Sequence, residues 1–159
     1  MSTPFDMITI TPAHADVLAA VHGEAFDEAW DADAFASILS QPGALGFIAC
    51  APGDGEPLGF ALLRIALFDG GGGEAEVLTI ATRPQARRQG VALAVMRAAL
   101  ADAQAQGVGQ IFLEVAEDNR AARMLYAGLG FEEVGRRKDY YARKDGPRVD
   151  AIVMAHACE

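Results

Sequence analysis

The chain has 159 residues, 52% of them hydrophobic, and a formal net charge of −9 at pH 7. This length and apolar content predict one globular domain over residues 1–159 with a sizeable core. The acidic balance argues against direct nucleic-acid binding. There is no apolar run of roughly 18 residues for a membrane span, and no basic and apolar start typical of a secretory signal.

The first forty residues predict one short strand and two helices. Residues 7–11 alternate between apolar and polar side chains, as a strand does. Pro12 begins a helical stretch that runs to Phe26. Asp31 is a candidate N-cap for a second helix over residues 32–40.

Three strands are expected next. Residues 44–51 and 58–68 are apolar runs separated by the turn sequence PGDGEP. Residues 74–82 form a third run after the glycine-rich sequence DGGGG, which we interpret as a turn.

Helices and strands alternate in the second half. We expect a helix from Gly90 to about residue 106, a strand over 110–115, a helix over 117–130, and strands over 131–141 and 149–157. This order predicts an α/β fold in which a mixed sheet has helices on both faces.

The sequence RRQG at residues 87–90 stands where a strand gives way to the long helix. Gly90 has no side chain, so another group can approach the backbone closely. The first N–H groups of a helix are unpaired and lie at its positive end. The pattern therefore favours an anion site, with a phosphate as the natural occupant, although a basic helix start facing solvent has the same composition.

The sequence RRQGVA resembles the pyrophosphate motif of the GNAT superfamily of acyl-CoA-dependent N-acetyltransferases. It is followed at the expected distance by LEVAEDNRAARMLYAGLGF (residues 113–131), which resembles the strand, Asn-bearing turn and Tyr helix of that superfamily. The resemblance implies a mostly antiparallel seven-stranded sheet flanked by four helices, and acetyl-CoA as the acetyl donor. Ala92 stands where the motif has its last glycine.

Within the superfamily the chain is most similar to the RimI-type ribosomal-protein alanine N-acetyltransferases. Four segments carry this likeness: EAFDEAWDADAF, EAEVLTIATRPQARRQGVA, LEVAEDNRAARMLYAGLGF and RRKDYYARKDGPRVDAIVMA. The turn KDGPRVD is one residue longer than usual, which affects the expected substrate loop.

The candidate cofactor-binding residues are one group at the helix start, one group on the preceding strand, and Asn119. Backbone N–H groups around the helix start would hold the pyrophosphate: Arg88, Gln89, Gly90, Val91, Ala92 and Leu93. The resemblance implies that the strand edge at Ile80, Ala81 and Thr82 pairs with the pantetheine amides. It also implies a cofactor contact by Asn119, whose position equally suits a helix N-cap.

Glu114 and Tyr126 are the candidate catalytic residues. Glu114 lies in the apolar sequence FLEV, where burying a carboxylate is costly, and we interpret it as the base that deprotonates the amine. The alternative is a solvent-facing position on an alternating strand. Tyr126 follows 12 residues later. The resemblance makes it the proton donor to the coenzyme A sulfur, although from the residues alone a core aromatic fits better.

The acceptor side is defined less sharply. Trp30, Tyr140 and Tyr141 are candidates to line a peptide groove, but Trp30 is equally suited to packing between helices. Strand alternation allows at most one tyrosine of the pair to face the substrate. We interpret the basic run RRKDYYARKDGPR as a solvated hairpin, with a contact to an acidic partner or the nucleotide 3′-phosphate as the alternative.

These observations predict direct acetyl transfer to the N-terminal α-amine of a protein, with a ribosomal protein that begins with alanine as the expected substrate. A small amine or a lysine side chain is the alternative acceptor, and a non-catalytic acyl-CoA-binding module the alternative of another class. The two cysteines and three histidines stand in no ligand-like spacing, so we expect reduced thiols and no metal. We further expect a cytoplasmic protein that is a monomer or a weak homodimer.

Overall fold

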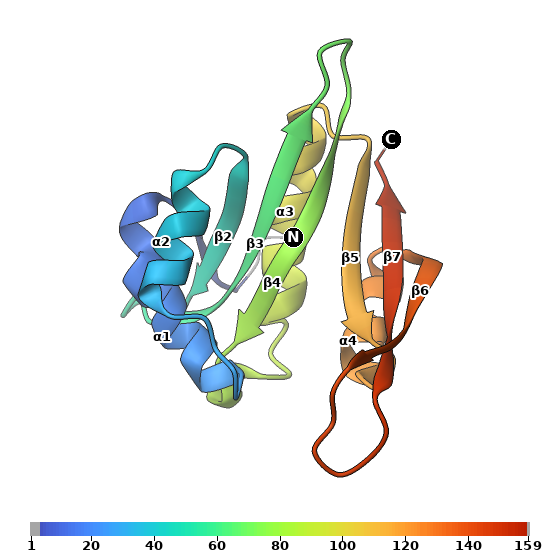
Figure 1. Ribbon diagram of the computed structural model, residues 1–159. Helices are drawn as coiled ribbons and strands as arrows, with labels where there is room; N and C mark the ends of the chain where they lie inside the picture. Colours follow the sequence, from blue (N-terminus) through green and yellow to red (C-terminus); the bar gives the residue numbers. More distant parts are fainter. Residues whose placement is uncertain (1–3, 159) are drawn as a thin grey trace.

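The computed structural model describes residues 4–158. Seven strands form one sheet in the order β1-β2-β3-β4-β5-β7-β6 (Figure 1). Each neighbouring pair is antiparallel except β4 and β5, which are parallel. The strands are β1 (Asp6–Thr9), β2 (Ala44–Cys50), β3 (Pro57–Leu67), β4 (Gly73–Thr82), β5 (Gln110–Ala116), β6 (Glu132–Tyr141) and β7 (Val149–Ala157).

The helices cover both faces of the sheet, so the predicted mixed architecture is confirmed (Figure 1). On one face lie α1 (Ala15–Ala25) and α2 (Ala32–Ser40); on the other lie α3 (Val91–Ala105) and α4 (Arg120–Gly128). The predicted helix over residues 12–26 begins later than expected. Its first turn, Pro12–His14, is a 3₁₀ helix, in which the N–H of Thr11 donates to the Nδ1 atom of His14 at 2.9 Å.

Local signals in the sequence set the helix starts. The Asp31 carboxylate accepts from the N–H of Ala34 at 2.8 Å, which confirms it as the N-cap of α2. Asn119 caps α4 in the same way, accepting from the N–H of Ala122 at 3.2 Å. Gly90, at φ +86°, precedes α3.

Two buried clusters hold the layers together. The cluster under α1 and α2 includes Leu18, Phe35 and Phe60, each 0% exposed. The cluster under α3 and α4 includes Val95 and Ile111, also 0% exposed. Complete burial of each of these large apolar side chains stabilises the fold by about 1.5–3 kcal/mol. Because the packing occurs on both sides of the sheet, it fixes the helices relative to the strands.

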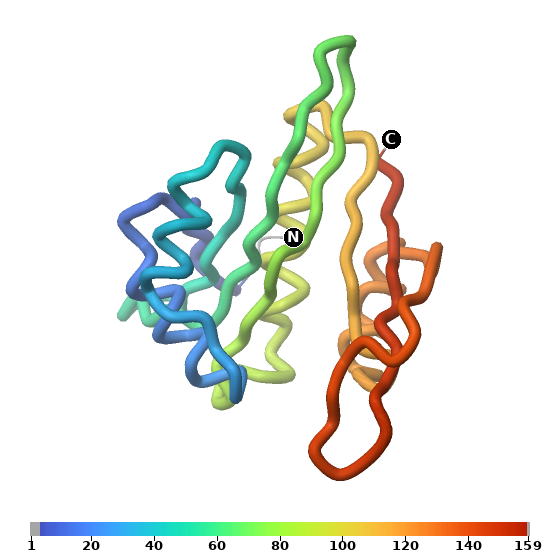
Figure 2. Tube along the Cα trace, in the orientation of Figure 1, coloured from blue at the N-terminus to red at the C-terminus, as the bar shows by residue number. Residues whose placement is uncertain are grey.

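The sheet opens between β4 and β5. Their parallel pairing covers only residues 74–76 of β4 and 110–112 of β5, and beyond it the two strands diverge (Figure 2). The pairing of β3 with β4 also shifts by one residue, because Leu62 faces Thr79 while Leu63 faces Val77. Leu78 is therefore the extra residue of a β-bulge, which bends β4 away from β5.

Candidate active site

A cleft of about 990 Å³ occupies the opening between β4 and β5. It brings together most of the residues predicted from the sequence. Those that line it are Ile80, Ala81, Thr82, Arg88, Gly90, Val91, Ala92, Leu93, Glu114, Asn119, Tyr126 and Tyr141. Gln89, Trp30 and Tyr140 are not among the lining residues.

The start of α3 forms one end of the cleft. Arg88 and Gly90 have left-handed backbone conformations, at φ +64° and +86°. The first helical hydrogen bond runs from the N–H of Ala94 to the carbonyl of Gly90 at 3.0 Å, so the three preceding N–H groups have no partner within the helix. The first turn holds no acidic residue, and a Cβ added to Gly90 would meet no atom within 4 Å. The backbone thus presents open donors at a positive helix end, and these can hold a phosphate group.

Gln89 lies beside this turn but not in the cleft. Its side-chain amide donates to the carbonyl of Gln85 at 3.2 Å, within the turn itself. The side chain therefore helps to shape the turn.

The outer half of β4 forms one long wall. Beyond Glu76 no residue of β4 pairs with β5, and residues 77–82 line the cleft. On its other side β4 still pairs with β3 as far as Thr82. The unpaired edge leaves main-chain donors and acceptors facing the cleft, available to an extended ligand that carries amides.

Glu114 projects into the cleft from β5. Its side chain is 30% exposed, and Oε1 forms an ion pair with Nε of Arg137 at 2.7 Å. The ion pair was not expected from the sequence, which suggested a carboxylate set among apolar neighbours. The partner lies on β6, 23 positions away along the chain, and reaches Glu114 because β7 pairs with both β5 and β6.

Tyr126 faces the cleft from α4. Its ring packs edge-on against Phe131 at a centroid distance of 5.9 Å. Burial, with a smaller contribution from nearby Tyr141, raises the pKa of Tyr126 to about 12. The hydroxyl therefore stays protonated across the physiological range and acts as a hydrogen-bond donor.

The two adjacent tyrosines take different positions, in line with strand alternation. Tyr141 lines the cleft, whereas Tyr140 is 47% exposed and lies outside it. The guanidinium of Arg143 lies 5.8 Å from the centre of the Tyr141 ring and also lines the cleft. It donates two hydrogen bonds to Asp118, at 2.7 and 2.8 Å, which join the β6–β7 connection to the turn before α4.

The basic run is mostly exposed along β6 and its connection to β7, in line with its interpretation as a solvated hairpin, and Arg143 within it also lines the cleft. Arg143 was not selected as a site residue, because its acidic partner lies 25 positions earlier in the chain.

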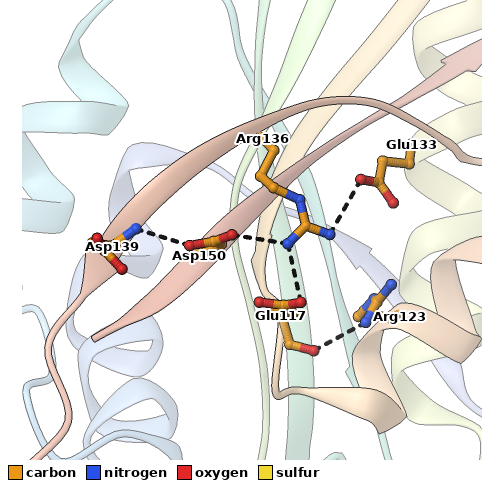
Figure 3. A network of polar contacts seen from close by, with 6 residues as sticks. All are labelled: Glu117, Arg123, Glu133, Arg136, Asp139 and Asp150. Carbon is orange, nitrogen blue, oxygen red and sulfur yellow. Dashed lines mark hydrogen bonds and ion pairs between the residues drawn. The ribbon is translucent and has the colours of Figure 1, made fainter. Parts of the chain in front are cut away.

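A polar network supports this end of β6 (Figure 3). Arg136 pairs with Asp150 at 2.8 Å and with Glu117 at 3.0 Å. Asp150 also accepts from the N–H of Asp139 at 2.9 Å. The register between β6 and β7 shifts between residues 137 and 141, so the network holds an irregular stretch that directs Tyr141 into the cleft.

Trp30 belongs to an aromatic cluster beside the cleft. Its ring stacks on that of His22 at a centroid distance of 5.1 Å, and it also packs against Phe35 at 5.5 Å. This is the packing role considered from the sequence. Ala25 and Phe26, which the sequence did not single out, line the cleft on this side.

Comparison with known proteins places this geometry in a family. Residues 13–131 match the family described as the acetyltransferase (GNAT) family. The chain belongs to this family. The turn before α3 and the diverging strands β4 and β5 frame the cleft. The described residues contain no group of three or more His, Cys, Asp or Glu side chains placed to hold a metal ion. Within residues 4–158 every helix is too short or too polar to cross a membrane.

Individual GNAT relatives are similar over most of the chain. The chain is 37% identical over 102 residues to the ribosomal protein bS18-alanine N-acetyltransferase of Escherichia coli K12. These residues make up 64% of this chain and 65% of the relative's own length. A crystal structure of the ribosomal-protein-S18-alanine N-acetyltransferase from Escherichia coli superposes with a TM-score of 0.85 and 28% identity, covering 98% of this chain and 94% of that one. Arabidopsis thaliana NAA60 in complex with acetyl-CoA has the same fold, with a TM-score of 0.80, 21% identity and coverage of 96% and 98%.

Proposed function

We propose that this protein is an acetyl-CoA-dependent N-acetyltransferase that acts on the N-terminal α-amine of a protein, with a ribosomal protein beginning with alanine as its substrate. The observation that carries the proposal is the cleft, where a carboxylate on β5 and a phenol on α4 lie beside an open helix N-terminus. The likeness to the E. coli ribosomal protein bS18-alanine N-acetyltransferase supports this choice of acceptor.

The donor would lie along β4 and the start of α3. The backbone N–H groups of residues 88–93 would hold its pyrophosphate, the edge at residues 80–82 would pair with its amides, and Asn119 would contact it from the start of α4. The open space in front of Gly90 fits a phosphate oxygen close to the backbone. When bound, acetyl-CoA supplies the activated acetyl thioester.

Glu114 would remove the proton from the attacking amine, directly or through a water molecule. An α-amine has a pKa of about 7.7–8.0 and lysine one of about 10.4, so at pH 7 roughly a tenth of α-amines are neutral, against about one lysine in 2,500. A single carboxylate base therefore suffices more easily for an α-amine than for a lysine.

Tyr126 would act on the leaving sulfur. Its pKa of about 12 lies about 3.5 units above that of an ordinary thiol, so complete proton transfer from Oη would cost about 5 kcal/mol. We therefore assign Tyr126 as a hydrogen-bond donor that stabilises the negative charge developing on the sulfur as the C–S bond breaks, while Oη keeps its own proton. Coenzyme A then leaves as the thiolate and takes its proton from water.

The acceptor would approach from the side of α1 and Tyr141. Of the three aromatic residues singled out from the sequence, Tyr141 is the one that we retain as a substrate contact, because it lines the cleft. The net charge of −9 favours a basic partner such as a ribosomal protein. Cys50 and Cys158 are free thiols, which suits the reducing cytoplasm where that substrate is made.

Two matched peptides test the proposal, with labelled acetyl-CoA as the donor. One has a free N-terminal alanine and no lysine; the other has a blocked N-terminus and one internal lysine. We expect label on the first peptide alone, and a loss of turnover in Glu114→Gln. Label on the lysine peptide alone would assign the protein to lysine modification. Label on neither, with acetyl-CoA still bound, would refute the proposal and leave a small-amine acceptor or a binding role.

A further inference from the structure

His22 is buried and uses both ring nitrogens, yet the chemistry proposed above does not involve it. It is 3% exposed on α1. Its Nδ1 atom accepts a hydrogen bond from the backbone N–H of Trp30 at 3.0 Å, and Nε2 lies 3.1 Å from the hydroxyl oxygen of Thr79. The ring is enclosed by four aromatic side chains: Phe26, Trp30, Phe35 and Phe60.

These contacts fix the tautomer of the ring. Because Nδ1 accepts from Trp30, the hydrogen of the neutral ring is on Nε2, which donates to the Thr79 oxygen. Burial lowers the pKa of His22 below its ordinary value, so the ring is neutral at pH 7. The Thr79 hydroxyl is then an acceptor toward His22, and its own hydrogen is free to point elsewhere. Among residues 4–158 the structure shows no acceptor for that hydrogen.

Thr79 stands where the acceptor would pass. It follows the bulged residue Leu78 in β4 and lines the cleft. The helix start that would hold the donor phosphates lies on the face of the sheet covered by α3 and α4, whereas Ala25 and Phe26 line the cleft from the α1 side. The α1 side of the cleft is thus left for the acceptor, and His22 connects this side to the bulge of β4 through its contact with Thr79.

We propose that His22 is a positioning residue for the acceptor: it directs the Thr79 hydroxyl toward a carbonyl oxygen of the bound peptide and holds the Phe26–Trp30 segment against β4. The inference rests on the proposed function. It adds a polar contact that selects a peptide-like acceptor, with an amide carbonyl close to the reacting amine, over a simple alkylamine.

Two pairs of variants test the hydroxyl of Thr79 and the two ring contacts of His22 separately. Thr79→Val removes the hydroxyl at nearly constant volume, and Thr79→Ser keeps it. His22→Asn keeps an acceptor near the Nδ1 position for the Trp30 N–H, whereas His22→Gln keeps a donor near the Nε2 position for Thr79. Glu24→Gln is the control, because Glu24 ties the same helix to Arg83 beyond β4 without touching Thr79.

The measurements are KM for an alanine-starting hexapeptide and the dissociation constant for acetyl-CoA. Loss of one hydrogen bond predicts a KM about five- to tenfold higher in Thr79→Val and His22→Asn, and no further rise in the double variant, because the two residues act as a unit. Thr79→Ser and Glu24→Gln should stay within about twofold of wild type, as should acetyl-CoA binding in every variant. His22→Gln keeps the contact to Thr79 but loses the one to Trp30, so its KM should rise less than that of His22→Asn.

The outcomes are distinguishable. A wild-type protein that turns over no peptide refutes the proposed function. An active wild type whose peptide KM is unchanged in Thr79→Val, or rises equally in Glu24→Gln, overturns the role of His22 alone. A matching rise in the acetyl-CoA dissociation constant would also overturn it, since the hydroxyl would then serve the donor.

Discussion

Replacement of Gly90 by alanine tests the phosphate-binding turn, and the same helix supplies the control. Gly90 precedes α3 at φ +86°, and Gly107 follows the other end of that helix at φ +98°. A Cβ at either position would meet no atom within 4 Å. Each alanine variant should lose about 1–2 kcal/mol of unfolding free energy, because a left-handed conformation strains any residue with a Cβ. This corresponds to a melting temperature lower by about 2–8 °C in both variants.

Ligand binding should separate the two variants. A methyl group at Gly90 points into the open space before the helix start, so it keeps a phosphate oxygen from the backbone N–H groups. Loss of one hydrogen bond to a charged group costs about 1.5–3 kcal/mol, which weakens coenzyme A binding by about 10- to 150-fold. Gly107 lies at the far end of α3, about 15 residues and roughly 22 Å along the helix, so the same methyl group there should leave affinity unchanged.

Titration calorimetry with coenzyme A and thermal unfolding of the unliganded proteins give the two numbers. Equal losses of stability in the two variants, with weaker coenzyme A binding in Gly90→Ala alone, would support phosphate binding at the start of α3. Binding within threefold of wild type in a folded Gly90→Ala protein would show that the phosphate lies elsewhere.

Three further predictions concern other parts of the cleft. Tyr126→Phe should lower kcat by about 100-fold at unchanged acetyl-CoA affinity, and this ratio should be the same at pH 7 and pH 9, because Tyr126 stays protonated below its pKa of about 12. A ratio that shrinks toward pH 9 would contradict this. Asp118→Asn should raise the peptide KM severalfold at low salt by releasing Arg143, and about 0.5 M NaCl should move wild type toward the variant, because these exposed charges are screened. The unfolding free energy should decrease as the pH falls below 6.5. The pKa of His22 is lowered in the folded protein, so the unfolded chain binds the extra proton first. Chemical denaturation of His22→Gln should not show this decrease, and a pH profile identical to that of wild type would refute the prediction.

The sequence by itself determined the order and type of the elements. Apolar periodicity located all seven strands and the four helices, within a few residues at their ends. The helix starts at Asp31, Gly90 and Asn119 could be predicted because a cap or a turn is a contact between residues three or four positions apart. For the same reason the anion site before α3 was visible in one short stretch of sequence, and the family resemblance then related it to Glu114 and Tyr126.

Tertiary structure alone decided how those elements frame a cleft. The splay of β4 from β5 depends on a bulge at Leu78, which appears only when β3 is laid beside β4. The ion pair between Glu114 and Arg137 and the position of His22 against Thr79 join residues 23 and 57 positions apart. No local pattern encodes such contacts, because a charged or polar side chain looks the same in the sequence whether it meets water or a distant partner. The register of the sheet and the packing of α1 decide whether such a side chain meets water or a distant partner. They thereby determine the charge and the hydrogen bonding of the site.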